Sequence, residues 1–173
     1  MEVRMLEPIS DHIKENLLVL FVGFNPSVKS SETGHHYANP NNRFWTILHN
    51  AGITQRKYSA SEDGELLEFG FGFTNIVHRP TKEAQEITKE EYKAGREELR
   101  RKISIYKPLI ACFVGKGVYK EYSGKREVNW GIQGNSVVEG TVDFVAPSSS
   151  GLVRMKLDDI IKIYAELPKI LKR

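Results

Sequence analysis

The chain has 173 residues and a mass of 19.7 kDa, which suits one globular domain and leaves too little length for two independent cores. Lys and Arg number 25 and Asp and Glu number 22, so the net charge of +3 excludes the strongly basic balance of a histone-like binder. Any nucleic-acid surface must therefore be a local patch. The single Cys112 excludes an internal disulfide, a cysteine-cage zinc site and an iron–sulfur cluster held by several cysteines. We expect one domain spanning residues 1–173.

The first 16 residues carry acidic side chains and no continuous apolar core, so neither a secretory signal nor a membrane anchor is expected. The longest apolar run, Leu17 to Val22, is far shorter than the roughly 20 residues that a membrane-spanning helix needs. We expect a soluble monomer without a membrane partner. It would be cytoplasmic and nucleoid-associated in a prokaryote, or nuclear in a eukaryote.

Four apolar stretches predict the core strands. Leu17–Val22 and Leu109–Val114 are continuously apolar and each stops at a glycine, as strands buried on both faces do. Val142–Ala146 is a third such stretch, and Phe71–Val77 is a weaker one because Gly72 interrupts it. Parallel strands of this kind predict a sheet that is covered on both faces.

Helical patterns lie between these strands. Residues 42–50 follow an Asn-rich turn, and residues 89–106 are preceded by Thr88 with Glu91 three positions later, which is a capping box. Residues 157–167 predict the closing helix. Strands that alternate with helices predict an open α/β sheet, in which ligands bind beyond the carboxyl ends of the strands. The loops that follow strands are therefore where a site is expected.

Four segments carry a resemblance to a known family. They are GFNPS at residues 23–27, GHHYANPNNRFW at 34–45, GFTNIVHRPT at 72–81 and APSSSGLVR at 146–154. In that order and at these separations they resemble the motifs of the mismatch-specific uracil/thymine DNA glycosylases, a branch of the uracil-DNA glycosylase superfamily. The resemblance implies a three-layer α/β/α sandwich around a short, mainly parallel sheet. It also implies flipping of a base from double-stranded DNA with G·U or G·T mismatches, and excision that needs no cofactor and leaves an abasic site.

The resemblance also implies roles for individual residues. Asn25 matches the asparagine that positions the attacking water, and Tyr37 matches the aromatic residue that stacks on the flipped base. The remaining base-binding residues are Gly23, Phe24, Ser30, His36 and Asn75. The segment that closes the site and wedges into the duplex comprises Ser148, Ser149, Ser150, Gly151, Leu152, Val153 and Arg154.

The chemistry fits these residue types. Breaking a deoxyribosyl bond builds positive charge on the sugar and negative charge on the departing pyrimidine, so the base needs hydrogen-bond donors at its oxygens. Backbone N–H groups around Gly23 and Phe24, together with the Asn75 amide, can supply them. The amide of Asn25 does not titrate, but its carbonyl can accept a hydrogen bond from water and hold it in line.

Other functions account for the motifs less well. His35 and His36 form a possible metal pair, but the other histidines show no ligand spacing and no cysteines join them, so no metal is expected. The triple serine lacks the GxSxG pattern of a hydrolase nucleophile. Gly115-Lys116-Gly117 lacks the phosphate-loop pattern and is expected to turn the chain, with Lys116 facing a DNA phosphate or solvent.

Two questions stay open at this stage. GHHY and PSSS resemble the eukaryotic thymine-processing branch, whereas Gly151-Leu152 resembles the compact bacterial enzymes, so the preferred base is not determined. The alternative function is a non-catalytic nucleic-acid or nucleotide-binding module on the same fold. A module that only binds would have no reason to keep Asn25.

Overall fold

The computed structural model describes residues 6–172, and none of the helices in that range is both long and apolar enough to cross a membrane. Its centre is a five-stranded sheet in the order β2-β1-β3-β5-β4. The strands are β1 (Val19–Gly23), β2 (Phe71–Asn75), β3 (Ile110–Val114), β4 (Gly131–Ile132) and β5 (Val142–Ala146). All neighbours pair in parallel except β4, which pairs antiparallel with β5.

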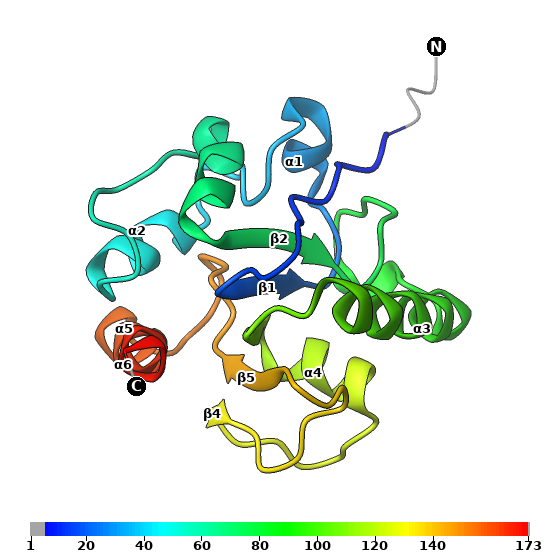
Figure 1. Cartoon of the computed structure of the whole chain (residues 1–173). Coiled ribbons are helices and arrows are strands. Elements are labelled where there is room, and N and C mark those ends of the chain that lie inside the picture. The colour runs from blue at the N-terminus through cyan, green and yellow to red at the C-terminus, as the bar shows by residue number, and fades with distance from the viewer. Residues whose placement is uncertain (1–5, 173) are drawn as a thin grey trace.

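Helices cover both faces of the sheet. The α-helices are α1 (Val28–Thr33), α2 (Phe44–Asn50), α3 (Lys89–Tyr106), α4 (Lys116–Ser123), α5 (Leu157–Tyr164) and α6 (Glu166–Leu171). Two 3-10 helices are η1 (Ala60–Phe69) and η2 (Ala84–Glu86). Figure 1 shows α3 and α4 on one side of the sheet and α2, α5 and α6 on the other. The predicted three-layer α/β/α sandwich around a mainly parallel sheet is confirmed.

Alternating side chains of β1 build the two hydrophobic cores. Val19 and Phe21 point into the core shared with α2, α5 and α6, whereas Leu20 and Val22 point into the core shared with α3 and α4. Successive side chains of a strand face opposite sides, so a strand between two helix layers must be apolar at every position. This is the physical reason for the unbroken apolar run in the sequence.

The predicted elements agree with the structure to different degrees. The strand at 142–146 and the helix at 89–106 are confirmed with the same bounds, and Thr88 Oγ1 accepts the N3 amide of Glu91 at 3.2 Å. The predicted closing helix is two helices, α5 and α6, which meet at Ala165. The turn expected at residues 115–117 is instead the start of α4. Gly115, the N-cap of α4, and Gly117, in its first turn, are weak helix formers, so the sequence pattern did not indicate a helix here.

The carboxyl ends of the parallel strands meet at one edge of the sheet. Gly23 is in register with Asn75, and Val114 is in register with Ala146. The loops that follow β1, β2 and β5 therefore begin side by side. This edge is where the segments singled out from the sequence come together.

Candidate active site

A cavity of about 1110 Å³ opens at this edge of the sheet. It lies between the loops after β1, β2 and β5 and the segment that joins α1 to α2. The predicted residues that line it are Gly23, Phe24, Asn25, Ser30, His36, Tyr37, Asn75, Ser148, Ser149, Ser150, Gly151 and Leu152. Segments more than 100 residues apart in the chain thus form a single site.

Two predicted residues lie outside the lining of this cavity. Val153 is half-buried and packs against the core shared with α2 and α5, and Arg154 is exposed. The sequence reasoning also missed lining residues, among them Ile9, Arg43 and Thr81. Arg43 lies in the segment at residues 34–45 and Thr81 in the segment at residues 72–81. Both segments were singled out from the sequence, but the roles of these two residues were not.

The side chain of Asn25 is fixed by its amide nitrogen. Nδ2 donates to the backbone carbonyl of Arg79 and to Oγ1 of Thr81, both at 2.8 Å. Thr81 Oγ1 in turn donates to the carbonyl of Glu83 at 2.8 Å, so it is available to Asn25 only as an acceptor. With both amide protons committed, the carbonyl oxygen is what Asn25 can offer to a ligand in the cavity.

An ion pair holds Arg79 in place. The guanidinium of Arg79 donates through two nitrogens to the carboxylate of Glu91, each at 2.9 Å, and to the carbonyl of Glu86 at 3.0 Å. The paired guanidinium keeps the pKa of Glu91 below its ordinary value. Glu91 is also the capping-box residue of α3, so the first turn of this helix anchors the strand-end loop that holds Asn25.

Tyr37 forms a wall of the cavity in a strained backbone conformation, with φ of 50°. Its ring stacks on Phe44 with centroids 3.8 Å apart and planes 12° apart, and its carbonyl accepts the indole N–H of Trp45 at 3.2 Å. Its hydroxyl is buried without a hydrogen-bond partner among the described residues, and burial raises the pKa of this hydroxyl well above its ordinary value. One ring face is thus covered, and a ligand can stack only on the other.

Gly23 allows Tyr37 and Asn75 to approach the end of β1. A Cβ atom at this position would lie 2.7 Å from Oδ1 of Asn75 and 3.3 Å from the hydroxyl of Tyr37. The carbonyls of Gly23 and Phe24 accept the backbone amides of Ile76 and Val77, each at 2.9 Å. A side chain at Gly23 would therefore displace the floor of the cavity.

Ser30 lies at the cavity but also joins two segments. Its hydroxyl accepts the amide of Ala38 at 3.1 Å and the hydroxyl of Ser27, the N-cap residue of α1. Ser27 Oγ accepts the amide of Ser30 at 3.0 Å. These bonds connect α1 to the residue after Tyr37, so Ser30 sets the position of that wall.

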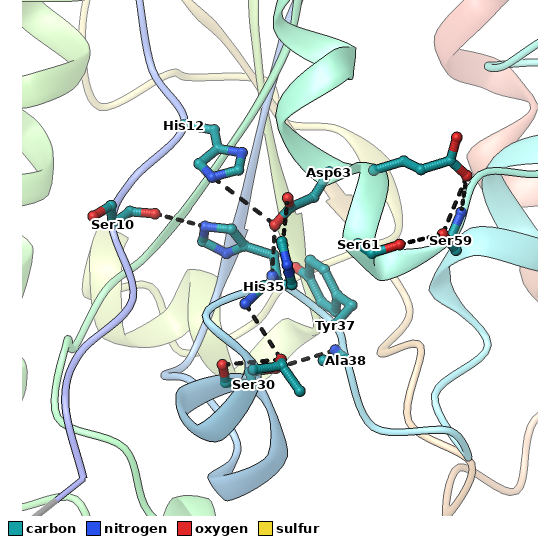
Figure 2. A network of polar contacts seen from close by, with 12 residues as sticks. Ser10, His12, Ser30, His35, Tyr37, Ala38, Ser59, Ser61 and Asp63 are labelled. Atoms are coloured by element: carbon teal, nitrogen blue, oxygen red, sulfur yellow. Dashed lines mark hydrogen bonds and ion pairs between the residues drawn. The ribbon is translucent and has the colours of Figure 1, made fainter.

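His36, the residue before Tyr37, is buried, and its hydrogen-bond partners Ser10 and Asp63 are labelled in Figure 2. Its Nε2 donates to the carbonyl of Ser10 at 2.9 Å, and its backbone amide donates to Oδ2 of Asp63 at 2.8 Å. Burial lowers the pKa of His36 to about 4, so the ring is neutral at physiological pH. His36 thus supports the loop before Tyr37 from below.

The loop after β5 is held by its backbone and leaves one large side chain in solvent. The amide of Arg43 donates to the carbonyl of Ser149 at 2.9 Å, and its guanidinium donates to the carbonyl of Ser150 at 3.2 Å. A Cβ on Gly151 would lie 2.6 Å from the carbonyl oxygen of Asn41, so this position requires glycine. Leu152 follows with 93% of its surface exposed. An apolar side chain presented in this way is suited to entering another molecule.

Lys116 lies at the same edge of the sheet, at the start of α4. Its ammonium group is 4.4 Å from the ring centroid of Trp130, which is a cation–π contact. The sequence analysis expected Lys116 to face a DNA phosphate or solvent and did not indicate this aromatic partner within the chain. Gly117 packs against the ring of Phe24, where a Cβ would come within 2.7 Å.

Comparison with known proteins places the chain in a family. A family model described as the uracil DNA glycosylase superfamily matches residues 10–170. A candidate uracil DNA glycosylase from Methanosarcina acetivorans, solved in solution by NMR, shares the fold. It matches with a TM-score of 0.60 and 20% sequence identity over 95% of this chain and 99% of its own. The chain belongs to the uracil DNA glycosylase superfamily.

Proposed function

We propose that the chain is a monofunctional DNA glycosylase that flips uracil out of double-stranded DNA, preferentially opposite guanine, and excises it. Thymine and modified cytosines opposite guanine are further bases that the same site would accept. The observation that carries the proposal is the orientation of Asn25, whose amide protons are both held at 2.8 Å so that its carbonyl is left for a water molecule. A module that only binds DNA has no use for this arrangement.

The size of the cavity favours a nucleotide still attached to its strand. At about 1110 Å³ it exceeds the roughly 300–1,000 Å³ that small-molecule sites usually enclose. A base flipped from a duplex brings its sugar and flanking phosphates with it. In this proposal the base stacks on the free face of Tyr37, while Asn75 and the backbone after Gly23 face its polar edge.

The reaction then needs few groups. The C1′–N1 bond breaks while water, held by the carbonyl of Asn25, attacks C1′ of the sugar. The water oxygen bonds to C1′, and the proton it releases ends on the departed base. No side chain that titrates near neutral pH is needed to activate the water. The rate therefore depends on how well the site stabilises negative charge on the base.

The preference for guanine opposite the base rests on the cost of flipping, and Leu152 lowers that cost for any base. Extruding a base costs a few kcal/mol and costs least where the pair is mismatched, which favours G·U and G·T sites over A·U. Leu152, 93% exposed beside the cavity, is suited to filling the space that the flipped base leaves. Both effects act on flipping and leave the chemical step unchanged.

A nicking assay tests the proposal. Duplexes that carry G·U, A·U, G·T or a G·modified-cytosine pair are incubated with excess protein, and each sample is divided before alkali treatment. We expect alkali-dependent strand breaks, fastest with G·U. Breaks without alkali would contradict a monofunctional enzyme. No break with any duplex, together with retained DNA binding, would instead support the non-catalytic module.

A further inference from the structure

Three ionisable side chains that are distant in the sequence converge under the Tyr37 wall. They are His12 from the N-terminal segment, His36 from the loop before Tyr37 and Asp63 from η1. Figure 2 labels His12 and Asp63. One potential ligand atom from each lies within 4.8 Å of the other two. The sequence argument against a metal relied on spacing along the chain, and the fold brings these residues together regardless of that spacing.

The carboxylate of Asp63 is the centre of this cluster. Asp63 is 1% exposed, and its only ion-pair partners among residues 6–172 are the imidazoles of His12 and His35. His35 Nδ1 lies 3.0 Å from Oδ1, and the amide of His36 donates to Oδ2 at 2.8 Å. A buried carboxylate is normally paired with a cation or coordinates a metal. Here the described part of the chain places no Lys or Arg beside it.

The imidazoles of His12 and His36 each keep a ring nitrogen without a hydrogen-bond partner among the described residues, and Nε2 of His12 is the nitrogen nearer to Asp63. His36 donates from Nε2 to the carbonyl of Ser10, which can only accept, so Nδ1 carries the lone pair of the neutral ring. Metal-bound histidines typically donate their other nitrogen to a backbone carbonyl in this way. The ring of His12 meets that of His36 edge-on with centroids 4.9 Å apart, and Nδ1 of His12 is buried without a hydrogen-bond partner in the described structure.

The distances between the potential ligand atoms would allow all three residues to bind one ion after a small movement of their side chains. His12 Nε2 is 3.9 Å from Oδ2 of Asp63, beyond hydrogen-bond distance. Two ligands on one tetrahedral zinc ion lie about 3.4 Å apart, given metal–ligand distances near 2.0–2.1 Å. Side-chain rotations that move each atom by a fraction of an ångström would close the gap. Imidazole and carboxylate are ligands that Zn²⁺ accepts.

We propose that His12, His36 and Asp63 form a binding site for a divalent transition metal of the Zn²⁺ class, with His35 as a fourth ligand or as a hydrogen-bond partner of the carboxylate. The ion would fasten the loop that carries Tyr37 to the N-terminal segment and to η1. Its role is structural, because the cavity contacts described for Asn25 do not involve it. The inference stands independently of the glycosylase proposal.

Zinc alone is the first probe. The whole chain is treated with a chelator, dialysed and titrated with ZnCl₂ by calorimetry, and Co²⁺ is added separately to read the geometry from its visible absorption. We expect one Zn²⁺ per chain and a tetrahedral Co²⁺ spectrum. At about 100 times the dissociation constant, Zn²⁺ should raise the midpoint of thermal unfolding by about 5–10 °C.

Two variants separate this site from surface binding. His12→Asn keeps a polar side chain at a partly exposed position but removes a ligand, and it should weaken Zn²⁺ binding by at least about tenfold and reduce the thermal shift at the same Zn²⁺ concentration to about half or less. His49→Asn, at an exposed histidine outside the cluster, should leave both unchanged. Zinc binding as tight in His12→Asn as in the wild type, or none in the wild type, would overturn the proposal.

Discussion

The two sides of the cavity differ in what holds their functional side chains. On the side of β1 and β2, the Asn25 amide is fixed by two bonds of 2.8 Å, and Tyr37 is stacked on the buried Phe44. On the side of β5, Arg43 and Tyr164 hold backbone carbonyls of the loop, and Leu152 stands in solvent. In the proposed function, the first side would carry the chemistry and the second would adapt to the duplex. Substitutions on the first should change the rate, and those on the second should change flipping and binding.

The largest effect is expected from Asn25→Ala. It removes the carbonyl that holds water while leaving the cavity walls in place, so the single-turnover rate on G·U duplex should fall about 100-fold or more. Binding of the duplex should stay within about threefold of wild type, because no charge is lost. Asn50→Ala, at an exposed asparagine at the end of α2, is the matched control. A wild-type rate for Asn25→Ala would remove Asn25 from the mechanism.

The next effect concerns stacking on Tyr37. Tyr37→Ala should lose about 1–3 kcal/mol of base stacking, which is a fall of about 5- to 150-fold in productive flipping. Tyr37→Phe should keep the activity within about twofold, because the hydroxyl has no hydrogen-bond partner in the described structure. Fluorescence of 2-aminopurine beside the lesion reports the flipped state. If the phenylalanine variant is as impaired as the alanine variant, the hydroxyl and not the ring face is what the base needs.

A smaller and selective effect is expected from Leu152→Ala. Truncating a side chain that fills the vacated space should slow the reaction about tenfold on A·U duplex, where a stable pair must be opened, and less than about threefold on G·U. Single-turnover rates on the two duplexes give the ratio. Equal losses on both would show that Leu152 does not act in flipping.

The smallest effect is expected from Arg154→Ala. Arg154 is exposed and lies outside the cavity lining, so a contact with a DNA phosphate is the role its position favours. Its loss should weaken binding to all duplexes alike and reduce the slope of log affinity against log salt by about 0.9. Binding curves at several salt concentrations test this. Lys169→Ala, at an exposed position on α6, serves as a charge-matched control.

The sequence predicted the sheet better than the connections. Strands such as Val19–Gly23 carry no polar side chain because both faces of the sheet are covered. Such a run can be recognised in the sequence without knowing which helices cover it. Short helices such as α1, with six residues, have no apolar periodicity long enough to detect. Its serine N-cap and its glycine after the last turn could have indicated it.

Most of the residues predicted from the sequence line the cavity, whereas the groups that hold them in place were not predicted. Asn25 and Tyr37 stand in recognisable segments, whereas the acceptors that orient Asn25 come from residues 79 and 81 through one backbone carbonyl and one hydroxyl. A backbone carbonyl leaves no trace in the residue type that carries it. The approach of Asp63 to His36, 27 positions away, likewise depends on how η1 packs, which local patterns do not encode.

The N-terminal segment has a consequence for self-association. β2 is an edge strand of the sheet, and among residues 6–172 its outer side pairs with that segment through one antiparallel bridge, in which His12 and Phe73 exchange backbone bonds of 2.9 and 2.8 Å. A Cβ on Gly72 would lie 2.3 Å from the carbonyl oxygen of His12, so the cover sits tightly on the strand. An uncovered edge is a template for pairing with other chains. The same short segment that contributes His12 would thus also oppose pairing of this edge with a second copy of the sheet.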